Sequence, residues 1–315
     1  MKINNTIQSV PGLFRYPPFT NFSFSNILLS NLLLAGLFLI AIPSFAQDDL
    51  LDMLGDDEPV LNYATAAFKG THIINGHSTK TKSKGELDFL IYHRFGPINS
   101  GIEEFFGLDQ ANMRLGFEYG ISDIINIGIG RSTYEKTYDG FVKWKFLRQK
   151  SGKENAPVSL VLLSTIAIPT VQIIEDLTTI ERMGYTNQLT ISRKFGHRLS
   201  FQLMPGMVHL NTVPRAADNN TVGYLGAAYR FKLNQSFALT GEYYYQFNPI
   251  QSVETYDAIG FGVDIETGGH VFQLHVTNSR QTFEKGFITD TRDNFWDGDI
   301  RFGFNISRTF QVSKK

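Results

Sequence analysis

Histidines are the side chains in this sequence best suited to metal or acid–base chemistry, because the chain has seven of them and no cysteine. Two pairs are five residues apart: His72 and His77 around an expected turn, and His270 and His275 on an expected strand. An odd spacing along one β-strand places two side chains on opposite faces, so neither pair is expected to chelate from a single strand. A metal ion needs three or four converging ligands. We therefore expect no metal site and no cofactor.

Contacts between distant strands are the remaining way to gather histidines, and they could bring together His93, His209 and His275. Spacing within one sequence does not test this.

Nucleophilic catalysis and phosphate binding have little support. No G-x-S-x-G elbow is present, and Ser78 beside His77 lies in a turn-like stretch, where serine is common. The string GIGR at 128–131 lacks the lysine and the strand-to-helix context of a phosphate loop. The absence of cysteine also excludes a cysteine-based zinc or iron–sulfur site. The chain is expected not to be an enzyme.

Charged residues at alternate positions of apolar runs say more about function than the histidines or the short motifs do. In the run 85–96, Leu87 and Phe89 share one face while Glu86 and Asp88 share the other. Charges of both signs occupy the polar face, a lining that either conducts ions or pairs internally. The candidate lumen-lining residues are Glu86, Asp88, Arg94, Arg114, Glu118, Lys143, Lys145, Lys194, Glu242, Asp264, Glu266, His275 and Arg301.

These charged residues lie in runs where apolar and polar residues alternate, which is the pattern of β-strands. Soluble sandwiches show the same alternation. Here, however, the runs match the ~9–11 residues of a tilted membrane strand better than the ~5–6 of a soluble one. Their apolar faces are rich in Phe, Ile and Tyr, as a lipid-facing surface with aromatic girdles requires. The sequence predicts an all-β chain, a single transmembrane antiparallel β-barrel of the outer-membrane type.

Connections between the runs alternate between short and long. Short turns lie at 121–123, 196–198, 234–235 and 268–269, and longer polar segments at 96–110, 170–183, 211–220, 249–256 and 280–298. Periplasmic turns and extracellular loops alternate in this way. The connection 133–137 is shorter than the pattern requires, and 150–157 is intermediate. The count predicts about twelve strands, with ten to fourteen as the alternatives, and both barrel ends on the periplasmic side.

The N-terminal region resembles an export signal. Residues 27–42 are apolar and uncharged, preceded by Lys2 and Arg15 and followed by small residues up to Ala46. A transmembrane anchor is the alternative, but this run is shorter than the ~20 residues that span a bilayer. We expect a cleaved signal peptide at 1–46, an acidic leader at 47–63, a segment at 64–84 in the lumen or at the periplasmic mouth, the barrel at 85–310, and a tail at 311–315.

Several strings resemble a bacterial family described only as a β-barrel protein of unknown function. The resemblance covers roughly residues 60–310 and rests on FKGTHIINGHS (68–78), IYHRFG (91–96), FFGLDQAN (105–112), ETGGHVFQLHVTNS (266–279) and GFNISR (303–308). It implies an outer-membrane barrel of a Gram-negative envelope, with no assigned activity and no catalytic residue to transfer.

These patterns favour a channel or facilitator for a small solute in the outer membrane. The alternative is a non-conducting structural or partner-binding barrel. Its long loop 280–298 carries Phe283, Phe287, Phe295 and Trp296, which suit a binding surface or an inward-folded constriction. The net charge of −1 argues against nucleic acid. The expected partners are outer-membrane lipid, the barrel-assembly machinery and a small-molecule solute.

Overall fold

Twelve antiparallel strands close into one barrel in the computed structural model, which describes residues 61–171, 177–267 and 270–313. The expected signal peptide at 1–46 and leader residues 47–60 lie outside the described residues. The barrel strands are β2 (Glu86–Pro97), β3 (Ala111–Gly120), β4 (Ile125–Ser132), β5 (Tyr138–Leu147), β7 (Ser159–Ile168), β8 (Gly184–Phe195), β9 (Leu199–Leu210), β10 (Thr221–Lys232), β11 (Phe237–Gln246), β12 (Ala258–Thr267), β13 (His270–Thr277) and β14 (Arg301–Gln311).

Each strand pairs with the next along the chain, and β14 pairs with β2 to close the barrel. Burial alternates along the strands: in β4, Asn126 is buried inside while Ile127 and Ile129 are exposed on the outer surface. Side chains on a strand alternate between its two faces, so the period of two in the sequence becomes an apolar outside and a polar inside. The predicted twelve-stranded antiparallel barrel is confirmed.

Connections at one end of the barrel, here called the turn end, are short between β3 and β4, β8 and β9, and β10 and β11. The intermediate connection between β5 and β7 holds β6 (Lys150–Ser151), which pairs with β1 (Asn62–Tyr63) before the barrel. The opposite, loop end carries short 3-10 turns: η1 (Ile98–Ser100), η2 (Phe105–Gly107), η3 (Tyr134–Lys136) and η4 (Phe295–Asp297). In the described parts of the chain, no helix has the length and apolar character needed to cross a membrane.

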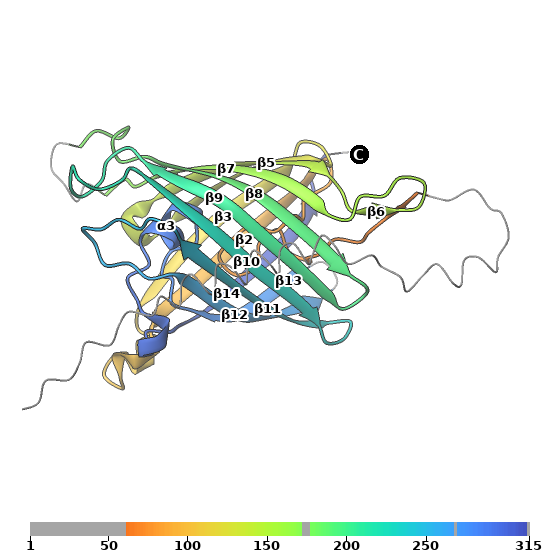
Figure 1. The fold of residues 1–315 in the computed structure, drawn as a ribbon. Coiled ribbons are helices and arrows are strands. Elements are labelled where there is room, and N and C mark those ends of the chain that lie inside the picture. The colour runs from red at the N-terminus through yellow and green to blue at the C-terminus, as the bar shows by residue number, and fades with distance from the viewer. Residues whose placement is uncertain (1–60, 172–176, 268–269, 314–315) are drawn as a thin grey trace, which may run out of the picture. The chain divides into compact units, whose positions relative to one another are not determined.

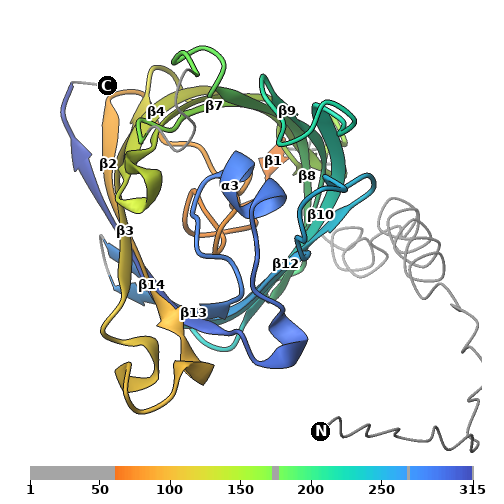
Figure 2. The same ribbon diagram turned by 90° about the vertical axis from the view of Figure 1, so that its left-hand side faces the viewer.

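Two segments that are not barrel strands fill the lumen, as the view along the barrel in Figure 2 shows. The first, residues 67–83, is called the lumen hairpin; its two arms meet at an isolated antiparallel bridge between His72 and His77. The second is the inner loop, residues 278–300 between β13 and β14, which contains the short helix α3 (Glu284–Thr289). Figure 1 shows α3 near the loop end, so the two segments occupy the lumen from opposite ends.

One side of the filled lumen is apolar. Ile73 and Ile74 of the lumen hairpin and Phe287 of α3 pack in one buried cluster with side chains of β9, β10, β11 and β12. The rings of Tyr244 and Phe287 lie 4.8 Å apart. The other side, lined by β2 to β5, is polar and carries the charged cluster described below.

Gly128 on β4 tests how tightly side chains pack against the barrel wall on the side lined by β2 to β5. A Cβ there would lie 2.2 Å from Cζ of Phe141 and 2.8 Å from the Phe117 carbonyl oxygen, whereas one at Gly140 would meet nothing nearer than 3.6 Å. Gly128→Ala should cost about 1–3 kcal/mol of stability through overpacking, and Gly140→Ala should stay within about 0.5 kcal/mol.

The measurement is the temperature at which the folded, fast-migrating band is lost on a detergent gel. We expect that temperature to fall in Gly128→Ala alone. Equal temperatures in the two variants would contradict the packing described here.

Candidate functional site

The tip of the lumen hairpin is held by one carboxylate of the wall. Glu242 on β11 accepts hydrogen bonds from the backbone N–H groups of Ile74, Asn75 and Gly76, at 3.4, 2.6 and 3.3 Å. Gly76 is required there, because a Cβ would lie 1.7 Å from the Tyr244 hydroxyl. A buried carboxylate that accepts several N–H groups is a strong anchor, so Glu242 fixes the hairpin in the lumen.

Further wall side chains bind the backbone and side chains of the same tip. Arg94 donates to the carbonyl oxygen of Ile74 at 3.1 Å and to Oδ1 of Asn75 at 3.0 Å. Asn305 on β14 also donates to the Ile74 carbonyl oxygen, at 2.9 Å. On the far side of the lumen, the hydroxyls of Thr79 and Ser192 are 2.6 Å apart. The hairpin thus contacts strands all round the barrel.

Charged pairs line the polar side of the lumen. Arg114 donates through Nε to Asp139 at 2.8 Å and makes a second bond through Nη2. The Lys143 ammonium lies 3.3 Å from Glu118 and donates to the Thr71 carbonyl oxygen at 2.9 Å. Buried charges need such partners.

His72 and His77 meet beside these pairs. Their Nε2 atoms are 3.2 Å apart, and a carboxylate oxygen of Glu118 lies within 4.8 Å of both. Glu284 of α3 approaches from the inner loop, with Oε1 3.6 Å from His77 Nε2. The odd-spacing argument applies to two residues of one strand; His72 and His77 instead lie on opposite arms of a hairpin and face each other across its bridge.

Burial shifts the pKa values of the groups in this cluster that lie outside the membrane-spanning strands. It lowers the pKa of His72 and of His77 well below the usual value, with the neighbouring positive charge of Lys143 acting in the same direction. Burial raises the pKa of the Glu284 carboxyl to about 7. Both imidazoles are therefore neutral near pH 7, the form in which histidine can bind a metal.

The structure places the predicted lumen-lining residues on the inner side of the wall. Those fully buried are Asp88, Arg94, Arg114, Glu118, Lys143, Glu242, Asp264, His275 and Arg301, and those half-buried are Glu86, Lys145, Lys194 and Glu266. Most of them bind the lumen hairpin, the inner loop or one another, and they do not form one catalytic centre. His275 is buried with neither ring nitrogen hydrogen-bonded.

His93, His209 and His275 do not converge. The ring of His93 stacks on Phe304 with centroids 4.9 Å apart, and His209 lies exposed beside the Thr221 hydroxyl. Across residues 61–171, 177–267 and 270–313, the one group of three ligands close enough for a metal is His72, His77 and Glu118.

Several charged residues of the lumen were not predicted from the sequence, and three of them show why. Asp139 pairs with Arg114, Arg230 pairs with Asp264 and Glu266, and Glu284 faces His77. Strand parity could have found the first two, because Asp139 shares its parity with Lys143 on β5 and Arg230 continues the inner face of β10. Nothing in the sequence marks Glu284, since it lies in a loop.

The aromatic loop expected at 280–298 divides into two parts. Phe283 and Phe287 are buried in the lumen, while Trp296 is 80% exposed at the loop end. The first half therefore folds into the lumen, and in the second half Trp296 is exposed while Phe295 packs against Phe261.

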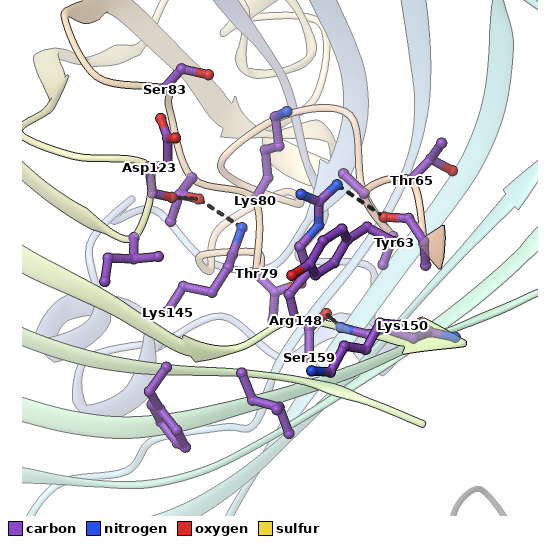
Figure 3. Close-up of a pocket in the computed structure, with 18 of the residues that line it drawn as sticks. Tyr63, Thr65, Thr79, Lys80, Ser83, Asp123, Lys145, Arg148, Lys150 and Ser159 are labelled. Atoms are coloured by element: carbon purple, nitrogen blue, oxygen red, sulfur yellow. Dashed lines mark hydrogen bonds between the residues drawn. The ribbon is translucent and has the colours of Figure 1, made fainter. Parts of the chain in front are cut away.

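A basic cavity opens at the turn end, between the lumen hairpin and the β5–β7 connection. Its volume is about 640 Å³, and Figure 3 shows Lys80, Lys145 and Arg148 around it. We call it the basic vestibule. Among the described residues none of these three pairs with a carboxylate; Lys145 donates to the Thr81 hydroxyl at 2.6 Å, and Arg148 stacks on Tyr63.

No curated protein matches the sequence. Among solved structures, a KdgM porin in complex with disordered oligogalacturonate is 10% identical, with 71% of this chain and 99% of that chain covered and a TM-score of 0.44. The COG4313 outer membrane channel from Pseudomonas putida F1 is 11% identical, with 73% and 97% covered and a TM-score of 0.44.

The match that identifies the chain is to a protein family. It covers residues 68–310, which include most of the lumen hairpin, the inner loop and nearly all of the barrel wall. The chain belongs to the family described as membrane bound beta barrel domain (DUF5777).

Proposed function

We propose that this barrel is an outer-membrane channel for a small, negatively charged solute, and that the lumen hairpin and the inner loop are its gate. The observation that carries the proposal is the position of the hairpin. It occupies the lumen without contributing a strand to the wall, so its withdrawal would break no hydrogen bond of the barrel ladder.

The polar groups of the wall would allow water to fill the lumen once the hairpin has withdrawn. Arg94 and Glu242 bind the hairpin through its polar groups. With the hairpin gone, water could take over these bonds, and a wall with charges of both signs hydrates readily. The apolar packing of Ile73 and Ile74 opposes opening, at about 1.5–3 kcal/mol for each fully buried side chain.

The basic vestibule supports an anionic solute. Lys80, Lys145 and Arg148 line it, and no carboxylate among the described residues pairs with them. The lining also holds one carboxylate, Asp123, so positive charge is in excess there. A cavity with an excess of positive charge raises the local concentration of anions.

Location and partners complete the proposal. The protein is exported through a cleaved signal peptide and inserted by the barrel-assembly machinery, with lipid around its apolar outside. Exposed residues such as Phe117 and Ile129 would contact that lipid.

A disulfide across the lumen tests the gate. Thr79 and Ser192 have hydroxyls 2.6 Å apart, and the chain has no native cysteine. With Thr79→Cys and Ser192→Cys together, we expect openings in planar bilayers under reducing conditions and none after oxidation, because the hairpin is then tied to the wall. Ser192→Cys alone is the control and should not respond to oxidation.

A second variant tests the same gate by weakening the hold on the hairpin instead of locking it. Glu242→Gln removes charge-assisted hydrogen bonds worth about 1.5–3 kcal/mol each, so the open fraction should rise about tenfold or more. If neither the reduced double variant nor Glu242→Gln conducts, the barrel is a non-conducting structural or partner-binding protein.

Charge reversal in the vestibule tests the sign of the solute. Lys145→Glu with Arg148→Glu should move the reversal potential in a KCl gradient from anion towards cation selectivity, and high salt should weaken the effect by screening. Lys153→Glu, exposed in the same connection but outside the cavity, is the matched control. An equal shift in the control, or none in the double variant, would refute vestibule-based selectivity.

If the short turns face the periplasm, the loop end of the barrel faces the outside of the cell. A cysteine at Asn219, exposed at the loop end, should react with an impermeant maleimide on intact cells, and one at His197, exposed at the turn end, should react only after lysis. The reversed pattern would place the vestibule on the cell surface.

A further inference from the structure

We propose that His72, His77, Glu118 and Glu284 bind one divalent transition-metal ion, which clips the lumen hairpin to both the wall and the inner loop. This inference does not depend on conduction.

The distances fit a tetrahedral site. Two ligand atoms about 2.1 Å from a tetrahedral zinc ion lie about 3.4 Å apart. Here the two histidine Nε2 atoms are 3.2 Å apart, and Nε2 of His77 is 3.6 Å from Oε1 of Glu284. A carboxylate oxygen of Glu118 lies within 4.8 Å of both histidine donors, close enough for a small side-chain adjustment to complete the set.

Unpartnered oxygens point to a missing ligand. Oε2 of Glu118 and Oε1 of Glu284 are buried and accept no hydrogen bond. A hydrogen bond between the two imidazoles would satisfy their Nε2 atoms without a metal but would leave both carboxylate oxygens unpaired, which is costly in a buried site. One cation gives a partner to all four groups.

The surrounding hydrogen bonds orient the ligands. Nδ1 of His72 lies 3.2 Å from the Thr71 hydroxyl, which leaves Nε2 free to face the metal. The Lys143 ammonium binds Oε1 of Glu118 and the Thr71 carbonyl oxygen, and Oε2 of Glu118 stays without a hydrogen-bond partner.

The local charge balance allows a cation despite two basic neighbours. Arg114 is held by Asp139 and Lys143 by Glu118, which leaves Glu284 as the carboxyl group of the cluster without a lysine or arginine partner. A divalent ion would stabilise its ionised form. Two imidazoles with two carboxylates favour a first-row transition metal such as zinc over calcium or magnesium.

The three segments that supply the ligands are independent parts of the fold. His72 and His77 lie on the lumen hairpin, Glu118 lies on β3, and Glu284 lies on α3. A shared ion would therefore tie both lumen segments to the wall, and metal binding should stabilise the folded barrel as any ligand of the native state does.

The test uses the full-length protein in detergent, purified through a tag without histidine and stripped with a chelator. Zinc is titrated in, and both the zinc content and the unfolding temperature are measured. We expect one zinc ion per wild-type chain and an unfolding temperature that rises with zinc. Glu284→Gln should weaken binding at least about tenfold, and His72→Gln with His77→Gln should abolish both responses.

His275→Gln is the control, because His275 is also buried in the lumen but lies outside the cluster. It should bind zinc as the wild type does. A folded band on a detergent gel shows that each variant keeps its barrel. Wild-type protein that takes up no zinc, or a His72→Gln, His77→Gln variant that binds it equally well, would overturn the proposal.

Discussion

A closed sheet of twelve strands encloses more space than its own inward side chains fill. In this protein the lumen hairpin and the inner loop occupy the remaining space. The inward face carries fully buried charges such as Arg94, Lys143 and Glu242. Buried charges without partners are strongly destabilising. The lumen hairpin and the inner loop supply many of the missing partners. The same two segments therefore both fill the lumen and bind its buried charges.

The hairpin is held by two different kinds of contact. Its tip is bound by charged wall groups, Glu242 on β11 and Arg94 on β2, while Ile73, Ile74 and Phe287 pack in an apolar cluster. Polar contacts exchange with water at small net cost, whereas apolar burial is lost outright on opening. In the proposed gate, the hairpin would therefore stay in the lumen until a bound solute, a partner or a voltage displaced it.

Strand positions could be predicted from the sequence because the period of two is a local property. The run at 85–96 matches β2 to within a residue, and the same parity identified Arg114 and Glu118 as inward. The meeting of His72 and His77 could not be predicted in this way, since it depends on a turn between them rather than on a strand. Glu284 was missed because a loop has no periodicity, and its place in the lumen depends on tertiary packing.

Hydrogen exchange of the hairpin amides tests the central claim, that the hairpin is bound inside the lumen in the resting protein. The N–H groups of Ile74, Asn75 and Gly76 are hydrogen-bonded to a buried carboxylate. Peptides covering 70–79 should therefore exchange as slowly as the barrel strands and far more slowly than the exposed loop segment 214–217. Exchange of 70–79 at the rate of that loop would show that the lumen is not closed by this segment, and would contradict the account.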